Sequence, residues 1–278
     1  MLYLILSMML WGTLGIFVLW SNLPAIDIAF YRCFIGALLM GLWLIKQKES
    51  IQFNKNTAII ALAGVCLVVN WLFLFKSFQV SNITIGNMSY YLQPILLILL
   101  GILFYREKVN AKKWGLISLA FCGVVLTIDW RNFSSPQIVE GCLFALLAAL
   151  LYSFLTILMK NNTSNFFKVL FIQLSIGVII LAPMTHFQMV TVTALTCILV
   201  IAILHTVVAY FFYYQAIKTT SFSQIAIVSY LDPIVAILTD ILFFQRQFNG
   251  LQITGIVLTF VSLYFLVTAA RSKKIIAA

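Results

Sequence analysis

The chain has 278 residues, of which 63% are hydrophobic and only 9% are charged. Soluble domains carry roughly a quarter charged residues, so this composition excludes a soluble globular protein and indicates an integral membrane protein. The net charge of +10 comes from Lys and Arg in short segments between apolar runs. That pattern is typical of loops facing an anionic membrane surface and does not indicate nucleic-acid binding.

Ten apolar runs are long enough to cross a bilayer, which takes about 20 residues of helix. They predict an all-α protein with transmembrane helices near 2–20, 25–46, 57–79, 83–104, 112–130, 137–160, 166–186, 191–215, 221–244 and 250–270. Pro24 precedes the second run and Ser134-Ser135-Pro136 precedes the sixth, and both are typical helix starts. The first run follows no Lys or Arg and no cleavage site stands out, so we expect a retained helix rather than a signal peptide.

Lys and Arg are distributed unevenly between the two sides of this predicted bundle. With the N-terminus in the cytoplasm, the outer side holds Arg131 and Arg246. The inner side holds Lys46, Lys48, Lys55, Arg106, Lys108, Lys112, Lys113, Lys160, Lys168, Lys218, Arg271, Lys273 and Lys274. Because cytoplasmic loops are enriched in Lys and Arg, we expect a multi-pass protein of the inner or plasma membrane. Both termini are then cytoplasmic, and residues 271–278 form a basic tail.

Two prolines lie deep inside apolar runs, and each follows a polar residue. Pro94 ends the segment 89–94 (SYYLQP), and Pro233 ends the segment 229–233 (SYLDP). A proline removes one backbone hydrogen bond and clashes with the carbonyl four residues earlier, which weakens the helix there. In hydrocarbon such a defect is tolerated where it is buried in protein or lines a cavity. A matched pair of defects points to a transporter's binding site, and we expect the two prolines to act as hinges.

The second half of the chain repeats features of the first at an offset of 139 to 141 residues. The matched positions are Tyr91 with Tyr230, Pro94 with Pro233, Phe73 with Phe212 and Trp11 with Tyr152. We therefore predict two five-helix repeats, over residues 1–130 and 137–270. Because five is odd, the second repeat would cross the membrane in the opposite sense, which makes an inverted repeat. Chance similarity between Leu- and Phe-rich helices is the alternative.

These features resemble the drug/metabolite transporter superfamily, and within it the EamA-like ten-helix branch. The resemblance covers nearly the whole chain and is carried by the two proline segments, Met9-Leu10-Trp11-Gly12, Phe30-Tyr31-Arg32, Tyr105-Arg106-Glu107-Lys108 and Trp114-Gly115. It implies a secondary transporter with a central cavity between the repeats and alternating access. The two halves differ in charge, because the second repeat has Gln245-Arg246 in place of Arg106-Glu107 and Gln173 in place of Arg32.

Asp232 is the leading candidate for charged contact with a substrate, because an ionisable side chain inside a span is costly and marks a functional site by default. Ser229, Asp232, Ala236 and Thr239 share one helical face, which we expect to line the cavity. Asp232 would bind a substrate amine or exchange a proton. A structural hydrogen bond, or a cap for the backbone freed by the following proline, is the alternative. Gln93 takes the matching place in the first repeat and offers only neutral hydrogen bonds.

Two further ionisable residues inside predicted spans are candidates for a functional role. Arg32 is a candidate to meet a carboxylate or phosphate on the substrate, to extend outward to the membrane surface, or to pair with Asp27 or Asp240. His205 is a candidate for a proton relay or for a hydrogen bond between helices. Two histidines without matching acidic residues predict no metal site, and no cofactor is expected.

Aromatic residues at midspan depth complete the predicted cavity. They are Trp11, Tyr90, Tyr91, Tyr152 and Tyr230. A buried tyrosine hydroxyl needs a hydrogen-bond partner, and an aromatic ring offers its face to an organic molecule. We expect these side chains to contact the body and the polar groups of a substrate.

No nucleophile elbow, phosphate loop or cluster of metal ligands occurs in the sequence, so we do not expect an enzyme. We expect a secondary transporter of a small polar organic metabolite, with an amino acid or related amphipathic compound favoured, export favoured, and proton coupling if Asp232 titrates. A lipid or polyprenyl-carrier flippase and a non-transporting scaffold or sensor are the alternatives. The expected partners are a small-molecule substrate, protons and membrane lipids, with no nucleic acid, and the chain is expected to act as a monomer or homodimer.

Overall fold

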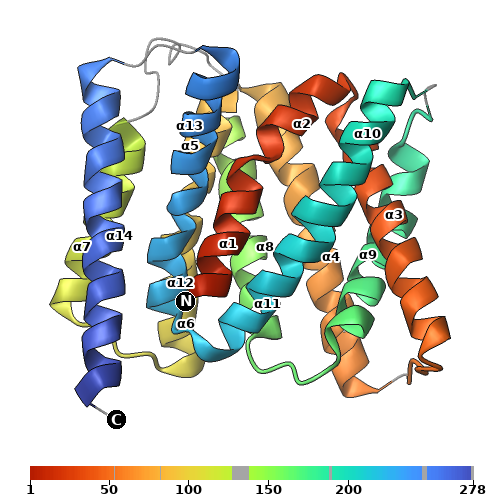
Figure 1. Ribbon diagram of the computed structural model, residues 1–278, viewed down its shortest axis with the longest axis horizontal. Helices are drawn as coiled ribbons and strands as arrows, with labels where there is room; N and C mark the ends of the chain where they lie inside the picture. Colours follow the sequence, from red (N-terminus) through yellow and green to blue (C-terminus); the bar gives the residue numbers. More distant parts are fainter. Residues whose placement is uncertain (53, 82, 127–137, 188–189, 246–248, 277–278) are drawn as a thin grey trace.

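The structure is a computed structural model that describes residues 1–278 except 53, 82, 127–137, 188–189, 246–248 and 277–278. The described residues form helices and contain no β-strand. Figure 1 shows the helices side by side, crossing the molecule between two ends that carry the loops. The predicted helix start at 134–136 and the charges of Arg131 and Arg246 lie outside the described residues, as does the side chain of Asp240.

The helices of the first half follow the predicted apolar runs. They are α1 (Leu2–Gly12), α2 (Leu14–Ser21), α3 (Ala25–Lys46), α4 (Lys55–Val80), α5 (Ile83–Tyr90), α6 (Gln93–Tyr105) and α7 (Ala111–Leu126). The run predicted over 25–46 is one uninterrupted helix with those bounds. The first and fourth runs are instead each divided into two helices.

The second half has the same kinds of element. They are α8 (Ile138–Met159), α9 (Phe166–Leu181) with the 3₁₀ turn η2 (Ala182–Met184), α10 (Val192–Val200), the π-helix η3 (Ile201–Val208), α11 (Ala209–Thr219), α12 (Phe222–Ser229), α13 (Leu231–Phe244) and α14 (Gly250–Ile276). In the described part of the chain, 7 helical segments are long and apolar enough to cross a membrane, and Gln93–Tyr105 and Gly250–Ser262 are shorter apolar helices. The chain is therefore a helical, multi-pass membrane protein.

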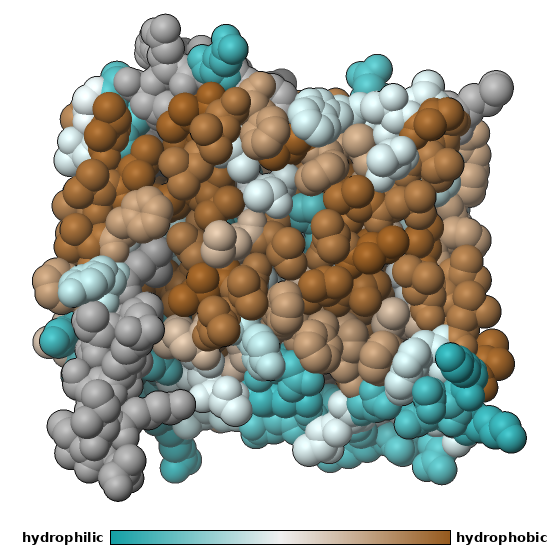
Figure 2. All heavy atoms as spheres, in the orientation of Figure 1, coloured by the Kyte–Doolittle hydropathy of each residue, from teal (hydrophilic) through white to brown (hydrophobic). Residues whose placement is uncertain are grey.

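The surface supports this conclusion. Figure 2 shows a broad band of hydrophobic side chains on one face, with hydrophilic side chains gathered along the lower edge. Large apolar side chains point outward, and Leu103, Ile179 and Leu242 are each at least 70% exposed. Exposing each of these to water would cost about 1.5–3 kcal/mol, whereas lipid accommodates them.

We call the end of the molecule that carries the loops 47–52, 106–110, 160–165 and 220–221 the basic end, and we call the other end the opposite end. Contacts join these loops to one another. The Asn165 side chain donates to Glu49 Oε1 over 3.3 Å, and Asn56 donates to Ser164 over 2.6 Å. Lys160 reaches the Thr220 carbonyl. The Lys and Arg residues predicted on one side that fall in these loops therefore do lie at one end.

Side-chain caps begin several helices, as the local sequence favours. Asn54 accepts from the Thr57 N–H over 3.0 Å at the start of α4, and Asn165 accepts from the Phe167 N–H over 3.1 Å at the start of α9. Ser221 and Gln224 form a reciprocal capping box at the start of α12. Such caps satisfy amides that have no partner inside the helix.

The helices are interrupted just ahead of both midspan prolines. α5 ends at Tyr90 and α6 begins at Gln93, while a single residue, Tyr230, separates α12 from α13. The backbone tightens there, because Leu92 N donates to Ser89 O over 3.2 Å and Tyr230 N donates to Ile227 O over 3.2 Å. The interruptions thus fall within two residues of the positions that the prolines predict.

Two other irregularities were not predicted, and they contact each other. α1 and α2 meet at Thr13, whose hydroxyl donates to Leu10 O over 2.8 Å. The π-helix η3 lies opposite, where the His205 ring nitrogen Nε2 is 3.0 Å from Thr13 Oγ1. Trp11 Nε1 donates to His205 O over 3.0 Å. Single π-helical turns often accompany functional sites.

Close helix packing at Gly12 gives a testable consequence. A Cβ added there would lie 2.7 Å from the Asp232 carbonyl oxygen and 2.5 Å from Val235 Cβ, so α1 and α13 would have to separate. We expect Gly12→Ala to lower the free energy of unfolding by about 1–3 kcal/mol. Thermal unfolding of the purified protein in detergent would measure this.

Gly15→Ala is the matched control, because a Cβ there meets no other helix within 4 Å. It should leave the midpoint unchanged or raise it slightly, since alanine favours a helix over glycine by about 1 kcal/mol. Equal midpoints for the two variants would contradict the assigned packing.

Candidate functional site

A cavity of about 250 Å³ lies where the two proline interruptions face each other. The predicted site residues that line it are Trp11, Arg32, Tyr90, Tyr91, Gln93, Pro94, Tyr152, Ser229, Tyr230, Asp232 and Pro233. The folded chain therefore brings together side chains from both halves of the sequence. His205 is the predicted site residue that does not line this cavity.

The cavity extends from the interruptions toward the opposite end. Val18 of α2, Ala25 of α3 and Leu74 of α4 line it there, and all three are half-buried. α3 runs from the opposite end to the basic end, so its first residues mark the opposite end. The mouth of the cavity therefore faces away from the basic end.

Aromatic rings form much of the cavity wall. The Trp11 ring lies 5.1 Å from the Tyr210 ring and 6.3 Å from the Tyr152 ring, between centroids, in edge-to-face arrangements. Trp11 donates its N–H to the His205 carbonyl, so its polar group is satisfied by the protein. The ring itself is left to contact a ligand.

Arg32 is buried, with 8% of its surface exposed, and it lines the cavity. Its Nε donates to Thr206 Oγ1 over 3.0 Å, and its guanidinium carbon lies 4.3 Å from the centroid of the Trp71 ring. Among the described residues no carboxylate lies within 4 Å of the guanidinium. The positive charge is thus held in place by neutral groups and lacks a counter-ion from this part of the chain.

This arrangement settles two alternatives for Arg32. The side chain does not reach the membrane surface, because it is buried against Trp71. It does not pair with Asp27, whose Oδ1 instead accepts from the His186 N–H over 3.1 Å.

Asp232 also lines the cavity and is half-buried. No hydrogen bond or ion pair joins its carboxylate to any other residue that the structure describes, so the cap for the freed backbone is not formed. Gln93, by contrast, has a hydrogen-bond partner. Its side-chain amide donates to the Ser153 hydroxyl over 3.4 Å, and its backbone carbonyl accepts from that hydroxyl over 3.2 Å. The two matched polar positions therefore differ in surroundings as well as in charge.

The predicted polar face, which runs from the end of α12 into α13, reaches the cavity over only part of its length. Ser229 and Asp232 line it, whereas Ala236 and Thr239 do not. Thr239 is buried and donates to the Ala236 carbonyl over 2.8 Å. The expectation that these two residues face the cavity is corrected accordingly, because the Thr239 side chain is buried and bonds to the backbone of its own helix.

His205 has a different environment from the one predicted for a substrate contact. It is buried with 1% of its surface exposed, and its ring lies 5.2 Å from the Phe17 ring and within hydrogen-bond distance of Thr13. It joins η3 to the junction of α1 and α2. Its contacts fit the alternative of a hydrogen bond between helices.

Hydrogen bonds also link the two halves beneath the cavity. The Tyr230 hydroxyl donates to the Tyr91 carbonyl over 3.2 Å, and Asn70 Nδ2 donates to Ala148 O over 2.6 Å. The same Asn70 amide lies 3.3 Å from the Tyr90 hydroxyl. These bonds fix the tyrosines that face the cavity.

Three contributors were missing from the predicted site. They are Trp71 beneath Arg32, Tyr210 beside Trp11, and Thr206 as the acceptor for Arg32 Nε. Trp71 and Tyr210 lie at midspan depth, which is a weak signal shared with many packing residues. Thr206 lies in the π-helix, which no sequence pattern indicated.

Comparison with known proteins places this geometry in a family. Residues 1–129 and 139–268 each match the EamA-like transporter family. The chain is 34% identical to an uncharacterized transporter of Bacillus subtilis (strain 168), YxxF, over 97% of this chain and 90% of that protein. It is 27% identical to Protein PecM of Dickeya dadantii (strain 3937), over 91% of this chain and 87% of that protein.

One solved structure, titled "Crystal structure of protein", superposes with a TM-score of 0.83 and covers 97% of both chains. At 14% identity, that likeness establishes the fold alone. The family matches span nearly the whole chain, and they establish that its functional class is membrane transport. The chain therefore belongs to the EamA-like transporter family, within the drug/metabolite transporter superfamily, and is a membrane transporter rather than an enzyme.

Proposed function

We propose that the chain is a secondary transporter of a small zwitterionic metabolite, an amino acid or a related amphipathic compound, that works by alternating access. The observation that carries this proposal is the pair of ionisable groups in one cavity. Arg32 and Asp232 both line it, and neither has an ionic partner among the described residues. Isolated charges within a membrane are costly, so a ligand that neutralises both groups is favoured.

Each end of such a ligand has a suitable partner. The Arg32 guanidinium uses Nε for Thr206, which leaves its two amino groups to bind a carboxylate through a pair of charge-assisted hydrogen bonds. Asp232 would take the ammonium group. The rings of Trp11, Tyr152 and Tyr210 would contact the carbon skeleton.

The ten predicted spans and their division into inverted repeats form part of the same proposal. The two separate family matches support repeats over residues 1–130 and 137–270. A Cβ on Gly36 would lie 2.5 Å from Leu174 Cδ1, and a Cβ on Gly177 would lie 2.5 Å from Cys33 Sγ. Residues 33 and 36 correspond to 174 and 177 at the sequence offset of 141, so these contacts are reciprocal, as a two-fold axis requires.

The same helices support the inverted sense of the second repeat. α3 ends at the basic end near Glu49, while α9 begins there after Asn165, so these packed helices run in opposite directions. We place the basic end in the cytoplasm because Lys and Arg gather there. Both termini are then cytoplasmic, and the cavity faces the outside of the inner or plasma membrane.

Alternating access would then follow from motion at the two interruptions. Pro94 and Pro233 begin the helices that continue past the cavity, and the backbone ahead of each has lost regular helical hydrogen bonds. Rocking one repeat against the other about these points would open the cavity toward the basic end. Export is the favoured direction for the proposal.

Ligand binding tests the charged pair directly. Purified protein would be screened by thermal shift against amino acids, their decarboxylated amines and their deaminated acids. A ligand at 100 times its Kd adds about 2.7 kcal/mol of stability, which is readily measured. We expect amino acids to stabilise the protein most. Stabilisation by lipids alone would favour the flippase alternative.

Variants then assign each charge to one end of the ligand. Arg32→Gln should weaken amino-acid binding at least about tenfold, because a hydrogen bond to a charged group contributes about 1.5–3 kcal/mol, and should leave binding of the decarboxylated amine unchanged. Asp232→Asn should likewise weaken amino-acid binding, and it should leave binding of the deaminated acid unchanged. Lys76→Gln, which removes an exposed charge outside the cavity lining, is the control. Unchanged amino-acid binding in both site variants would contradict the assignment.

Proton coupling is tested separately in reconstituted liposomes. An imposed pH gradient should drive accumulation of the bound amino acid by the unaltered protein. At saturating substrate, which offsets its weaker binding, Asp232→Asn should retain exchange of labelled for unlabelled substrate but should no longer respond to the gradient, because it has no carboxylate to protonate. Uptake that ignores the gradient, and that survives Asp232→Asn unchanged, would exclude Asp232 as the coupling group.

A further inference from the structure

We propose that Glu107 forms a clamp that holds the basic end of the transporter closed and makes the conformation open at the opposite end the resting state. This inference rests on the alternating-access function proposed above. It assigns a role to a residue that lies outside the cavity, on the loop between α6 and α7.

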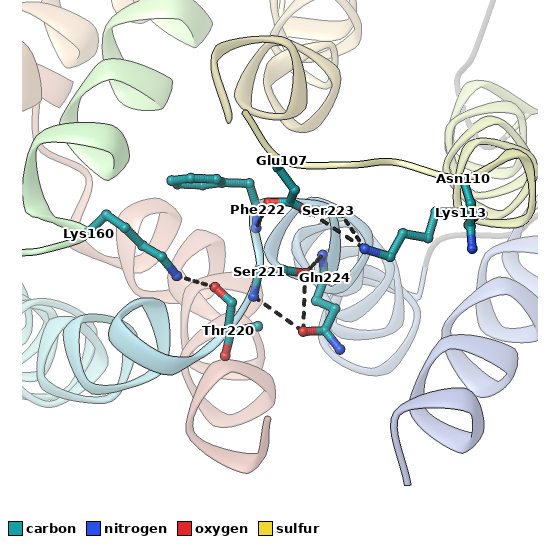
Figure 3. Close-up of polar contacts among 9 residues, drawn as sticks. All are labelled: Glu107, Asn110, Lys113, Lys160, Thr220, Ser221, Phe222, Ser223 and Gln224. Carbon is teal, nitrogen blue, oxygen red and sulfur yellow. Dashed lines mark hydrogen bonds and ion pairs between the residues drawn. The ribbon is translucent and has the colours of Figure 1, made fainter. Parts of the chain in front are cut away.

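The Glu107 carboxylate binds the first turn of α12, as Figure 3 shows. It accepts from the Phe222 N–H over 2.8 Å and from the Ser223 N–H over 3.2 Å, and it also accepts from the Ser223 hydroxyl. The first amides of a helix have no partner within the helix, and the helix dipole favours a negative charge there. One carboxylate from the first half thus completes the start of a helix in the second half.

Lys113 at the start of α7 strengthens this contact. Its ammonium group lies 3.7 Å from Glu107 Oε1 and donates to the Ser223 hydroxyl over 3.1 Å. The Glu107 side chain is only 14% exposed, so water and salt screen its interactions less than those of a surface pair. Lys113, Glu107 and Ser223 therefore form a closed triangle of polar contacts.

Lys160, just after α8, contacts the short link between α11 and α12. It donates to the carbonyls of Ile217 and Thr220, at the end of α11, and its Nζ lies 5.2 Å from the centroid of the Phe222 ring. Burial lowers the pKa of the Lys160 ammonium, and the nearby Glu107 carboxylate raises it in part. Two side chains of opposite charge thus fix the short link between α11 and α12 (Figure 3).

Phe222 closes the space behind the clamp. It is buried with 2% of its surface exposed, and its ring lies 5.0 Å from the Tyr105 ring. A Cβ added to Gly101 would lie 2.6 Å from Phe222 Cδ2, so the ring packs directly on the backbone of α6. α6 and α12 adjoin the two proline interruptions, which means that opening the basic end requires these contacts to break.

The second half cannot build the same clamp. Arg106 and Gln245 are counterparts at the offset of 139 and share a left-handed backbone, with φ of 52° and 51°. The next residue is Glu107 in the first half and Arg246 in the second. An arginine only donates hydrogen bonds, so it cannot accept from the amides at a helix start. At this matched position the sequence therefore places a carboxylate in the first half and an arginine in the second, and this difference biases the transporter toward the conformation open at the opposite end.

Cysteine accessibility tests the clamp without any substrate. The five native cysteines are first replaced by serine. Single reporters are then introduced as Ala226→Cys and Val18→Cys. Ala226 is fully buried between the clamp and the cavity, and Val18 lines the cavity mouth. Each reporter is combined with Glu107→Gln, and the rate of reaction with a water-soluble maleimide is measured on purified protein.

We expect Glu107→Gln to raise the labelling rate at Ala226→Cys about fivefold, because neutral hydrogen bonds replace charge-assisted ones. The rate at Val18→Cys should fall, since the population open at the opposite end decreases. Glu49→Gln removes an equal charge at the same end, from a more exposed pair with Lys168, and should change neither rate. If Glu107→Gln folds poorly, Ser223→Ala should give a smaller rise, about twofold.

Two outcomes would overturn the clamp: an unchanged rate at Ala226→Cys, or rising rates at both reporters, which would indicate general loosening. Failure of the proposed function is distinguishable, because labelling requires no ligand. We call a higher rate at Ala226→Cys together with a lower rate at Val18→Cys reciprocal labelling. Reciprocal labelling without amino-acid binding would support the clamp and reject the proposed substrate class. Amino-acid binding without reciprocal labelling would reject the clamp alone.

Discussion

Inside a membrane every backbone N–H and C=O group must find a partner within the protein, and this constraint explains why the site lies where it does. Pro94 and Pro233 each deny their helix a hydrogen bond, so α5–α6 and α12–α13 are interrupted. Interrupted backbone facing lipid would leave polar groups unsatisfied. The two interruptions instead face each other, where Tyr230 donates to the Tyr91 carbonyl across the junction. The cavity forms where these two stretches of irregular backbone, one from each half, are enclosed by protein.

The same constraint governs the charges. Arg32 is held by a threonine hydroxyl and a tryptophan ring, both neutral, and Asp232 lines the cavity without a hydrogen-bond partner in the described chain. A structural ion pair would have brought the two together and satisfied both. Neutral supports fix the position of the Arg32 guanidinium without cancelling its charge. This separation of opposite charges in one cavity is the basis on which we propose a zwitterionic substrate.

The sequence predicted those features that depend on local composition. The span 25–46 is a continuous apolar run, and it folds as α3 with the same bounds. The proline interruptions were predictable because a proline acts on its own helix. The junction at Thr13 and the π-helix over 201–208 were not, since no proline marks them and their contacts join α1–α2 to η3 across the bundle. Trp71 and Thr206 were missed for the same reason, because only tertiary packing identifies them as supports for Arg32.

Glu107 shows how a recognised motif can hide its physical role. The sequence alone shows an acid after an apolar run and its replacement by Arg246 in the second half. Its partners lie 115 and 116 residues away, at the start of α12, and become apparent only in the folded chain.

Duplicating one five-helix unit in opposite senses would give two equivalent ends, and equal ends would give no preferred conformation. A carboxylate that caps a helix at one end, and an arginine at the matching position of the other, breaks that equivalence without changing the backbone turn that carries them. The two halves therefore differ at two separate places: at the cavity, where Asp232 stands opposite Gln93 in the repeat, and at the basic end, where we propose that Glu107 favours one conformation of the empty transporter.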